Sequence, residues 1–567
     1  MKLLPFILLL LPVSLFAQNR YDVVIDEIMS DPTPQVGLPN NEWVELKNTS
    51  VTAINLQGWR IGDVSGQSGP MPAFTLQPDS FVIVCTGSAV AALSVYGATI
   101  SVTSFPSLDN DGEQLFLKNG NGMTIHAIDY SSSWFKNELK KEGGWSLEMI
   151  DTKNPCTGSD NWKASIDASG GTPGRKNSVD AVVIDHTAPQ LKNSYTTDKQ
   201  TIVLTFDESL DSVSASTITD YSIDGGITIN SAITLPPLFN LVQLKLTTDL
   251  SGNNIYTITT NNVTDCKGNS IGSASTVKTG IPVDAAAGDL VINEILFNPR
   301  PNGFDYIEVY NKSNKIFDAS KISIANRNSS GVISSIKTLS ATPVYIFPGD
   351  YVLLTENLES LQLNYLVKNP DKVFVISPMP SYPDDEGDVV LLNLQGEVAD
   401  EVKYNKDWHF KLIDNDEGVS LERIDPDGPS QDAGNWHSAA STAGFGTPTY
   451  VNSQFKQVQD VTATIELNSK VFSPDNDGRS DFAIIQYKIS EPGHVANVTV
   501  FDAAGKPVRS LVKNETIAAS GHWNWDGLND QGRKLPVGSY IIYTEIFNLQ
   551  GKKKMFKNVI VLARRLN

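Results

Sequence analysis

The stretch Glu42-Trp43-Val44-Glu45-Leu46-Lys47-Asn48 decides the fold. Its alternation places Val44 and Leu46 on one face of a strand, and Trp43 and Glu45 on the other. The stretch follows Asp26-Glu27-Ile28-Met29. Both return later, in the same order, as Asn293-Glu294-Ile295-Leu296 and Asp305-Tyr306-Ile307-Glu308-Val309-Tyr310-Asn311. The recurrence indicates an internal repeat of a β-rich module.

Further matched motifs continue the repeat downstream. They are Gly144-Trp145-Ser146-Leu147-Glu148 with Gly418-Val419-Ser420-Leu421-Glu422, Asn161-Trp162 with Asn435-Trp436, and Gly171-Thr172-Pro173 with Gly446-Thr447-Pro448. Short alternating runs between Asn-Gly and Asp-Gly turns predict a β-sandwich in each copy. A short helix is expected at residues 89–93 and at the matching residues 358–363.

These motifs resemble the lamin tail domain, an immunoglobulin-like sandwich, over residues 22–178 and 289–453. The resemblance implies modules that serve secreted bacterial proteins without catalysis, and it implies no catalytic residue. The second copy departs from the pattern, since it has Asn293 where the first has Asp26. The strand motif Gly58-Trp59-Arg60-Ile61-Gly62-Asp63 of the first copy is also less clearly reproduced in the second, near residues 322–326.

Two other domains complete the chain. Residues 185–282 carry Asp207-Glu208-Ser209-Leu210-Asp211 and Asp265-Cys266-Lys267-Gly268-Asn269, and resemble the bacterial Ig-like spacer domain of surface-layer proteins. Residues 457–567 carry Trp523-Asn524-Trp525-Asp526-Gly527 and Leu535-Pro536-Val537-Gly538-Ser539-Tyr540. They resemble the FlgD-type Ig-like domain and, more loosely, C-terminal sorting domains of type IX secretion. The expected fold class is all-β, with four tandem immunoglobulin-like β-sandwich domains.

Composition and the N-terminus bear on location. The chain has 567 residues and a formal charge of -20, which disfavours binding to nucleic acid. Residues 1–17 read as a signal peptide: Lys2, an apolar run too short to span a bilayer, and Ala17 before a polar stretch. We therefore expect a secreted or cell-surface protein with no transmembrane segment after signal cleavage.

Paired carboxylates are the first candidates for chemistry. Glu42 and Glu45 lie three positions apart on a strand, so they face opposite sides and cannot converge on a substrate. Glu27 and Glu45, with Glu294 and Glu308 in the second copy, are expected to hydrogen-bond loop amides at one end of the sandwich. The sequence also lacks a Gly-x-Ser-x-Gly elbow, HExxH and a P-loop. No catalytic residue and no organic cofactor are predicted.

The segment around Asp475, Asp477 and Asp481 is the candidate metal site. Carboxylates at nearly alternate positions around Gly478 suit Ca²⁺, although an EF-hand would need a Glu at the twelfth position. The alternative is a structural turn that caps a strand. The acidic turns at residues 109–113 and 384–388 have the same two interpretations.

Cysteines and tryptophans leave alternatives open. Cys85 and Cys156 lie in one module and either form a disulfide or leave Cys85 as a buried thiol, whereas Cys266 has no partner in its own domain. The matched Trp162 and Trp436 are expected in the core. Other tryptophans have no matched position that predicts burial, and these freer residues can stack on sugars. These freer residues are Trp134, Trp408 and Trp523.

The combined prediction is a non-enzymatic exported protein with a structural, adhesion or protein-interaction role at the cell surface. One alternative is a carbohydrate- or calcium-dependent binding protein. Another is a non-catalytic accessory to a secreted hydrolase. The expected partner is a surface protein or a polysaccharide.

Overall fold

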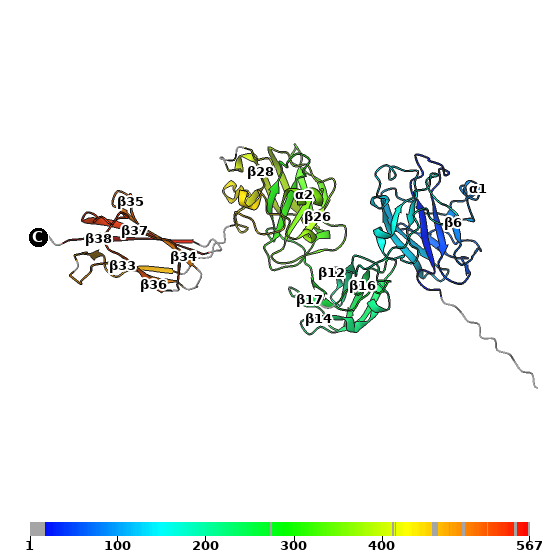
Figure 1. Cartoon of the computed structure of the whole chain (residues 1–567), viewed down its shortest axis with the longest axis horizontal. Coiled ribbons are helices and arrows are strands. Elements are labelled where there is room, and N and C mark those ends of the chain that lie inside the picture. The colour runs from blue at the N-terminus through cyan, green and yellow to red at the C-terminus, as the bar shows by residue number, and fades with distance from the viewer. Residues whose placement is uncertain are drawn as a thin grey trace, which may run out of the picture. The chain divides into compact units, whose positions relative to one another are not determined.

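The computed structural model describes residues 18–272, 275–410, 413, 415–455, 463–475, 477–489, 494–518, 520–548 and 553–564 (Figure 1). The expected signal peptide, residues 1–17, lies outside the described residues. The chain divides into two compact units. The first comprises Met1–Val283, Lys315–Ala319 and Thr342–Tyr345, and the second comprises Asp284–Asn314, Ser320–Ala341 and Ile346–Asn567. Each unit is described by itself below.

The first repeat of the module is built on a six-stranded sheet. In spatial order its strands are β11 (Trp162–Ala164), β10 (Leu147–Met149), β1 (Val23–Met29), β2 (Trp43–Asn48), β6 (Phe81–Cys85) and β7 (Thr99–Ser101). Neighbours are antiparallel except β6 and β7. Facing it are β4 (Arg60–Gly62), β8 (Gly112–Lys118) and β9 (Thr124–Ser131), with β3 (Ile54–Asn55) paired to β5 (Thr75–Leu76).

Both faces of the six-stranded sheet are buried. Val44 and Leu46 point into the main core with Trp59 and Trp162, as their alternation predicts. On the opposite face, Trp43 packs in a smaller cluster with Met29, Leu38, Ile83, Cys85, Ala89 and Leu93. The second face is therefore enclosed rather than solvated, because the loop containing Leu38 and the helix α1 (Val90–Leu93) cover it.

The second repeat has the same architecture. Its six-stranded sheet runs β26 (Val373–Val375), β25 (Tyr351–Thr355), β20 (Tyr306–Asn311), β19 (Leu290–Leu296), β29 (Leu421–Arg423) and β30 (Trp436–Ser438). The partner strands are β23 (Ile333–Thr338), β22 (Ser323–Arg327), β27 (Glu386–Leu392) and β28 (Val398–Asn405), with β21 (Phe317–Asp318) paired to β24 (Tyr345–Ile346). The weak motif at residues 322–326 thus forms an ordinary strand, β22.

Short helices lie between the strands. The two expected α-helices are confirmed: α1, and α2 (Leu358–Asn364), which Asn357 caps by accepting a hydrogen bond from the Ser360 amide at 2.8 Å. The 3₁₀ helices are η1 (Ser132–Phe135), η2 (Gly158–Asn161), η3 (Ser214–Ser216), η4 (Ile218–Asp220), η5 (Ala319–Lys321), η6 (Pro370–Lys372), η7 (Lys406–Trp408), η8 (Ala433–Asn435) and η9 (Ser441–Ala443).

The domain between the repeats is a sandwich of two antiparallel sheets. One sheet contains β12 (Leu191–Asp198), β13 (Thr201–Phe206), β16 (Leu241–Leu246) and β15 (Ile229–Leu235). The other contains β14 (Tyr221–Ile223), β17 (Ile255–Thr260) and β18 (Ser275–Gly280). Alternating residues such as Leu204, Leu244 and Ile258 fill the core between the two sheets.

The C-terminal domain is also a two-sheet sandwich. Its sheets are β31 (Ala463–Leu467), β33 (Ala483–Ile489) and β36 (Ser520–Trp525), and β32 (Val471–Phe472), β38 (Lys553–Leu562), β37 (Gly538–Asn548), β34 (His494–Asp502) and β35 (Pro507–Ile517). Trp525 is fully buried between Phe472 and Tyr540. The chain is thus all-β, as expected, and made of immunoglobulin-like sandwiches.

The cysteines confirm one alternative drawn from the sequence, a buried free thiol at Cys85, and rule out the other, a disulfide between Cys85 and Cys156. Cys156 of the first repeat forms a disulfide with Cys266 of the domain that follows it, with 6.3 Å between the Cα atoms. Cys85 is a free thiol buried beside Trp43. Cys266 has no partner in its own domain, as expected, but the loops bearing Cys156 and Cys266 meet within the first unit, so its partner comes from the neighbouring domain.

Candidate functional site

Three glutamates form a row across adjacent strands of the first repeat. Glu27 on β1 lies opposite Glu148 on β10 and opposite Glu45 on β2, and all three are fully buried. We call Glu148, Glu27 and Glu45 the glutamate row. Directly opposed residues share one face of a sheet, so their side chains crowd together there. This is the enclosed second face, which also carries Trp43.

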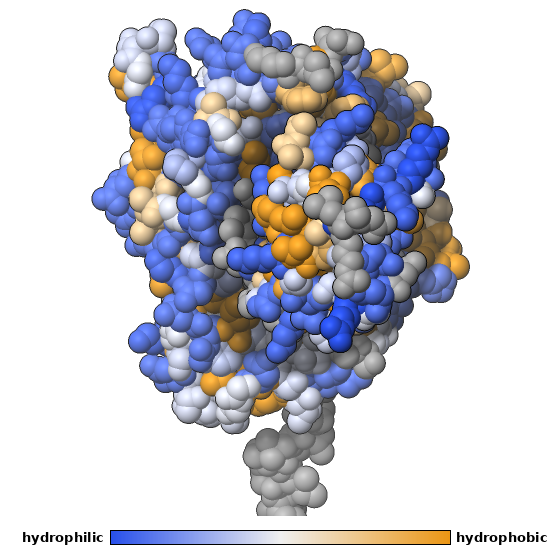
Figure 2. Space-filling model, turned by 90° about the vertical axis from the view of Figure 1, so that its left-hand side faces the viewer, coloured by the Kyte–Doolittle hydropathy of each residue, from blue (hydrophilic) through white to orange (hydrophobic). Residues whose placement is uncertain are grey.

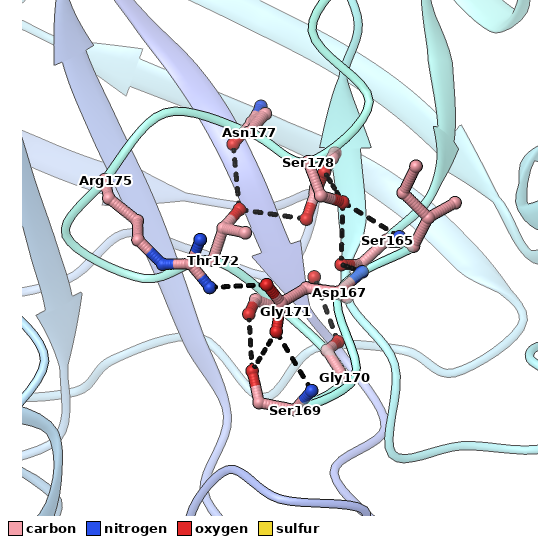
Figure 3. A network of polar contacts seen from close by, with 12 residues as sticks. Ser165, Asp167, Ser169, Gly170, Gly171, Thr172, Arg175, Asn177 and Ser178 are labelled. Atoms are coloured by element: carbon pink, nitrogen blue, oxygen red, sulfur yellow. Dashed lines mark hydrogen bonds and ion pairs between the residues drawn. The ribbon is translucent and has the colours of Figure 1, made fainter.

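The chain segment 171–179, which we call the closing loop, satisfies the row with its own donors. Thr172 donates its amide to Glu27 at 2.7 Å and its hydroxyl to Glu148 at 2.9 Å. The Gly174 amide donates to Glu45, and the Val179 amide to Glu148 at 3.1 Å. The loop is itself braced by Asp167, which accepts from Arg175 and Ser169 (Figure 3).

Close approach of this loop to the sheet requires glycine at position 171. A Cβ there would lie 2.8 Å from both Glu27 Oε1 and Ser146 Oγ. Ser146 Oγ itself donates to Glu27 at 2.5 Å. The Gly-Thr-Pro motif therefore exists to bring Thr172 within hydrogen-bonding distance of the glutamate row.

The second repeat builds the same site with Glu422, Glu294 and Glu308 in register. Its closing loop, 446–454, uses Thr447 as the first uses Thr172: the amide donates to Glu294 at 2.9 Å and the hydroxyl to Glu422 at 2.9 Å. The Thr449 amide donates to Glu308 at 2.6 Å. The prediction that Glu27, Glu45, Glu294 and Glu308 accept loop amides is confirmed in all four cases.

Burial controls the protonation of these groups. Desolvation, followed by the charge of Glu148, raises the pKa of Glu27 to about 8. Desolvation and Glu422 raise the pKa of Glu294 to about 7, and burial raises the pKa of Glu45 and of Glu308 well above the usual range. A carboxyl that holds a proton at neutral pH can donate one hydrogen bond and accept others, which suits a crowded row.

This arrangement is suited to stabilisation rather than to catalysis. The row lies under its closing loop and is fully buried, so no substrate atom reaches it. Glu42, only half-buried, accepts instead from the Leu108 amide at 3.1 Å, on the other side of the strand from Glu45. The prediction that Glu42 and Glu45 do not converge is borne out by these separate partners.

The predicted calcium ligands come together in the C-terminal domain. One carboxylate oxygen from each of Asp475, Asp477 and Asp481 lies within 4.8 Å of the others. Asp481 accepts from the Gly478 amide at 2.9 Å, and Asp477 from the Arg479 amide at 2.8 Å. These contacts belong to a compact turn, so the geometry accommodates both interpretations; Asn476 lies outside the described residues. The calcium site stays a prediction.

A second acidic group was not anticipated from the sequence. Asp185, Glu208 and Asp265 also bring one oxygen each within 4.8 Å, and burial together with Asp265 raises the pKa of Glu208 to about 8. Asp265 is buried and accepts from the Lys267 and Asn269 amides at 2.8 and 2.9 Å. Asp185, Glu208 and Asp265 are far apart in the sequence, so no sequence motif indicated that they would come together. Among the described residues, the turns at 109–113 and 384–388 form no such group.

Each repeat carries one partly exposed tryptophan packed against a buried one. Trp162 and Trp436 are buried, as expected from their matched positions. Trp134 of η1 lies 6.4 Å from Trp162, and Trp408 of η7 lies 6.3 Å from Trp436. Phe410, 47% exposed, lies against His437, with 5.4 Å between the ring centroids. His409, by contrast, is buried.

Comparison with known families accounts for the repeat. The Lamin Tail Domain family matches residues 17–132 and 284–406, the two segments that bear the glutamates Glu27, Glu45, Glu294 and Glu308. The chain contains two lamin tail domains. The FlgD Ig-like domain family matches residues 472–545, within the C-terminal sandwich. Each closing loop, and with it the third glutamate of each row, lies beyond the matched segment.

No curated protein matches the chain. Among solved structures, the N-terminal part of the bacterial S-layer protein SbsC is 14% identical, with 29% of this chain and 45% of that one covered and a TM-score of 0.17. The chain thus spans under half of that protein. A Ca²⁺-stabilized adhesin that helps an Antarctic bacterium bind ice is 9% identical. The match covers 97% of this chain and 100% of that one, with a TM-score of 0.15. The glucan-utilization protein SGBP-B of Bacteroides ovatus is 10% identical, covering 84% and 86%, at 0.17. Likenesses this low carry no argument about function.

No described helix has the length and apolar character that crossing a membrane requires. Figure 2 shows hydrophobic side chains in small groups among hydrophilic ones on the viewed face.

Proposed function

We propose that this protein is an exported, non-catalytic structural or adhesion protein of the cell surface, in which the lamin tail domains are rigid modules. The observation that carries the proposal is the glutamate row. In both domains three glutamates are buried side by side and bound by the closing loop, so the row holds the module together. Such a module offers its surface to partners, and its glutamate row is closed to a substrate.

The disulfide supports export. Disulfides persist in oxidising compartments and are rare in the cytosol, and Cys156–Cys266 joins two consecutive domains. Arg20 adds to this junction within the first unit: it donates to Leu210 O and Ser212 Oγ, both at 2.9 Å, and its guanidinium lies 3.8 Å from the Phe239 ring centroid. A disulfide and hydrogen bonds that join two consecutive domains suit a spacer that holds other domains in place.

Fractionation of the native cells tests the proposal. Protease treatment of intact cells, followed by mass spectrometry under non-reducing conditions, should release peptides of this protein and the linked Cys156–Cys266 peptide. The mature N-terminus should begin near Gln18 if residues 1–17 are removed. Recovery of the protein in the cytosol, with all three cysteines alkylated, would contradict the proposal.

Polysaccharide binding is the second candidate, favoured by Trp408 and Phe410. In the second lamin tail domain Trp408 is partly exposed where it stacks on Trp436, and Phe410 is 47% exposed; sugars stack on such aromatic faces. Affinity electrophoresis in gels containing bacterial or plant polysaccharides should show retardation that Trp408→Ala and Phe410→Ala both abolish. Leu394→Ala, which removes a side chain 58% exposed in the same domain, is the matched control. Retardation equal in all variants would exclude this site.

A further inference from the structure

Asp26 and Asn293 occupy the same position in the two lamin tail domains. Each lies at a bulge, where the register between β1 and β2 shifts between Ile25 and Glu27, and the register between β19 and β20 shifts between Ile292 and Glu294. A bulge inserts one extra residue and re-aims its side chain. Both Asp26 and Asn293 are buried, beside the glutamate row.

In the second domain the Asn293 amide is a double donor. Its nitrogen donates to Glu308 Oε1 at 2.8 Å and to Asn452 Oδ1 at 2.6 Å. Asn452 is held in place because its own amide nitrogen donates to the backbone oxygens of Asn293 and Arg423, at 3.0 and 2.9 Å. The position therefore calls for a hydrogen-bond donor, with acceptors on two sides.

The first domain has the same surrounding hydrogen bonds, but Asp26 replaces the donor Asn293. Asn177 donates to the backbone oxygens of Asp26 and Met149 at 3.0 and 2.9 Å, as Asn452 does in the second domain. Glu45 stands where Glu308 stands. Asp26 Oδ1 and Glu45 Oε1 are both buried without a hydrogen-bond partner among the residues that the structure describes. An ionised Asp26 has no hydrogen to donate, so two unpaired carboxylate oxygens would share one dry site.

We propose that Asp26 and Glu45 bind and share one proton, which takes the place of the amide hydrogen that Asn293 donates to Glu308. The first lamin tail domain is then a proton-binding module, and the second is its proton-independent counterpart at this position. The inference concerns the folded domain alone and does not depend on the proposed surface role.

The charges around Asp26 are consistent with a bound proton. On β2, Lys47 is directed to another partner: its ammonium lies 3.3 Å from Asp79 and 5.2 Å from the centroid of the Phe81 ring. Glu148 on β10 adds negative charge. Asp180, beyond the closing loop, pairs with Lys176 at 2.6 Å. Burial raises the pKa of Asp26 to about 7; Lys47 opposes the shift, and Glu148, Asp180 and Asp79 add to it.

The direction of the pH effect follows from this. A carboxyl that keeps its proton only in the folded state stabilises that state fully below its unfolded pKa of 3.8, and the stabilisation is lost as the pH rises through about 7. Between pH 5 and 7, one retained proton makes opening of the first domain about tenfold easier per pH unit. Other buried carboxyls titrate too, so the informative quantity is the slope difference between matched variants.

Hydrogen exchange of the whole chain, read by mass spectrometry, measures that slope for peptides covering residues 171–179 and 446–454 separately. Asp26→Asn installs the residue that the second domain already uses, so it is expected to fold. After correction for intrinsic exchange, it should remove about tenfold per pH unit from the opening of residues 171–179 between pH 5 and 7. Asn293→Asp should add the same factor to residues 446–454.

Two further measurements keep the proposal open to refutation. Infrared spectra at pH 6 should show the carbonyl stretch of a protonated carboxylic acid that Asp26→Asn loses, whether or not Asn293→Asp folds. An unchanged slope and spectrum in Asp26→Asn would mean that Asp26 is ionised, and would overturn the proposal. Protection of residues 171–179 by 1 mM Ca²⁺ in the wild type but not in Asp26→Asn would overturn it in favour of a metal ion.

Discussion

Glu27 on β1 stands directly opposite Glu45 on β2, and both carboxyl groups are fully buried. Like charges facing each other across a sheet destabilise it unless they are neutralised or hydrogen-bonded. The closing loop supplies the hydrogen bonds, and retained protons reduce the charge. Stability, pH response and loop structure are therefore linked in each lamin tail domain.

The central glutamate should be essential to its own domain. Glu27→Ala leaves Ser146 Oγ and the Thr172 amide without their acceptor and opens a cavity under the closing loop. We expect a loss of about 2–4 kcal/mol in the free energy of unfolding of the first lamin tail domain. Urea denaturation followed by exchange at residues 171–179 measures it. Glu42→Ala, which removes a half-buried carboxylate with one amide partner, is the control and should cost less than about 1 kcal/mol. Equal losses would refute a special role for Glu27.

Both lamin tail domains should be less stable in mild alkali than in mild acid. The pKa of Glu27 is raised to about 8 and that of Glu294 to about 7, so these groups hold protons in the folded state that the unfolded chain has released. Their contribution is fully present below the ordinary glutamate pKa of 4.5 and declines as the pH rises through 7 to 8. Thermal unfolding at pH 5.5 and 8.5 tests this. Glu27→Gln and Glu294→Gln should flatten the dependence; midpoints that rise with pH would contradict the expectation.

Reduction should uncouple the first lamin tail domain from its neighbour. Removing the bond between Cys156 and Cys266, which are separated by 110 residues, should lower the free energy of unfolding of the first unit by about 2–4 kcal/mol. Calorimetry of Cys156→Ser, with and without dithiothreitol, provides the measurement. In that variant the reductant should have no further effect. Cys85→Ser should keep the reductant-sensitive transition, because Cys85 is free. Sensitivity to reductant in Cys156→Ser would point to a different pairing.

Calcium should bind weakly at the turn of the C-terminal domain. Three exposed or half-exposed aspartates suit a site with a dissociation constant on the order of 10⁻⁴–10⁻³ M. Titration calorimetry should show one event that Asp477→Asn weakens. Asp526→Asn, which alters another aspartate of the same domain that caps the Leu528 amide at 3.0 Å, is the control. Absence of heat at 5 mM Ca²⁺ would leave the turn as a purely structural feature.

Much of the glutamate site was accessible from the sequence. The recurrence of Glu27 and Glu45 as Glu294 and Glu308 marked these four as special, and the period of two along the strand separated Glu45 from Glu42. Glu148 and Glu422 stood in a repeated motif, yet no pattern joined them to the row. Pairing of β10 with β1 places Glu148 in its row, and pairing of β29 with β19 places Glu422; each pairing closes a long stretch of chain.

Local pattern alone determined the repeat, the strands, the short helices and the all-β class, because alternation and turn residues act between near neighbours in the chain. Three features follow from the tertiary structure alone. They are which carboxyl groups are buried together, the coverage of the second face of the six-stranded sheet, and the pairing of Cys156 with Cys266. Those outcomes depend on contacts between segments remote in sequence. Burial then sets the charge of Asp26 and Glu27, since the cost of desolvation arises only when the fold has excluded water.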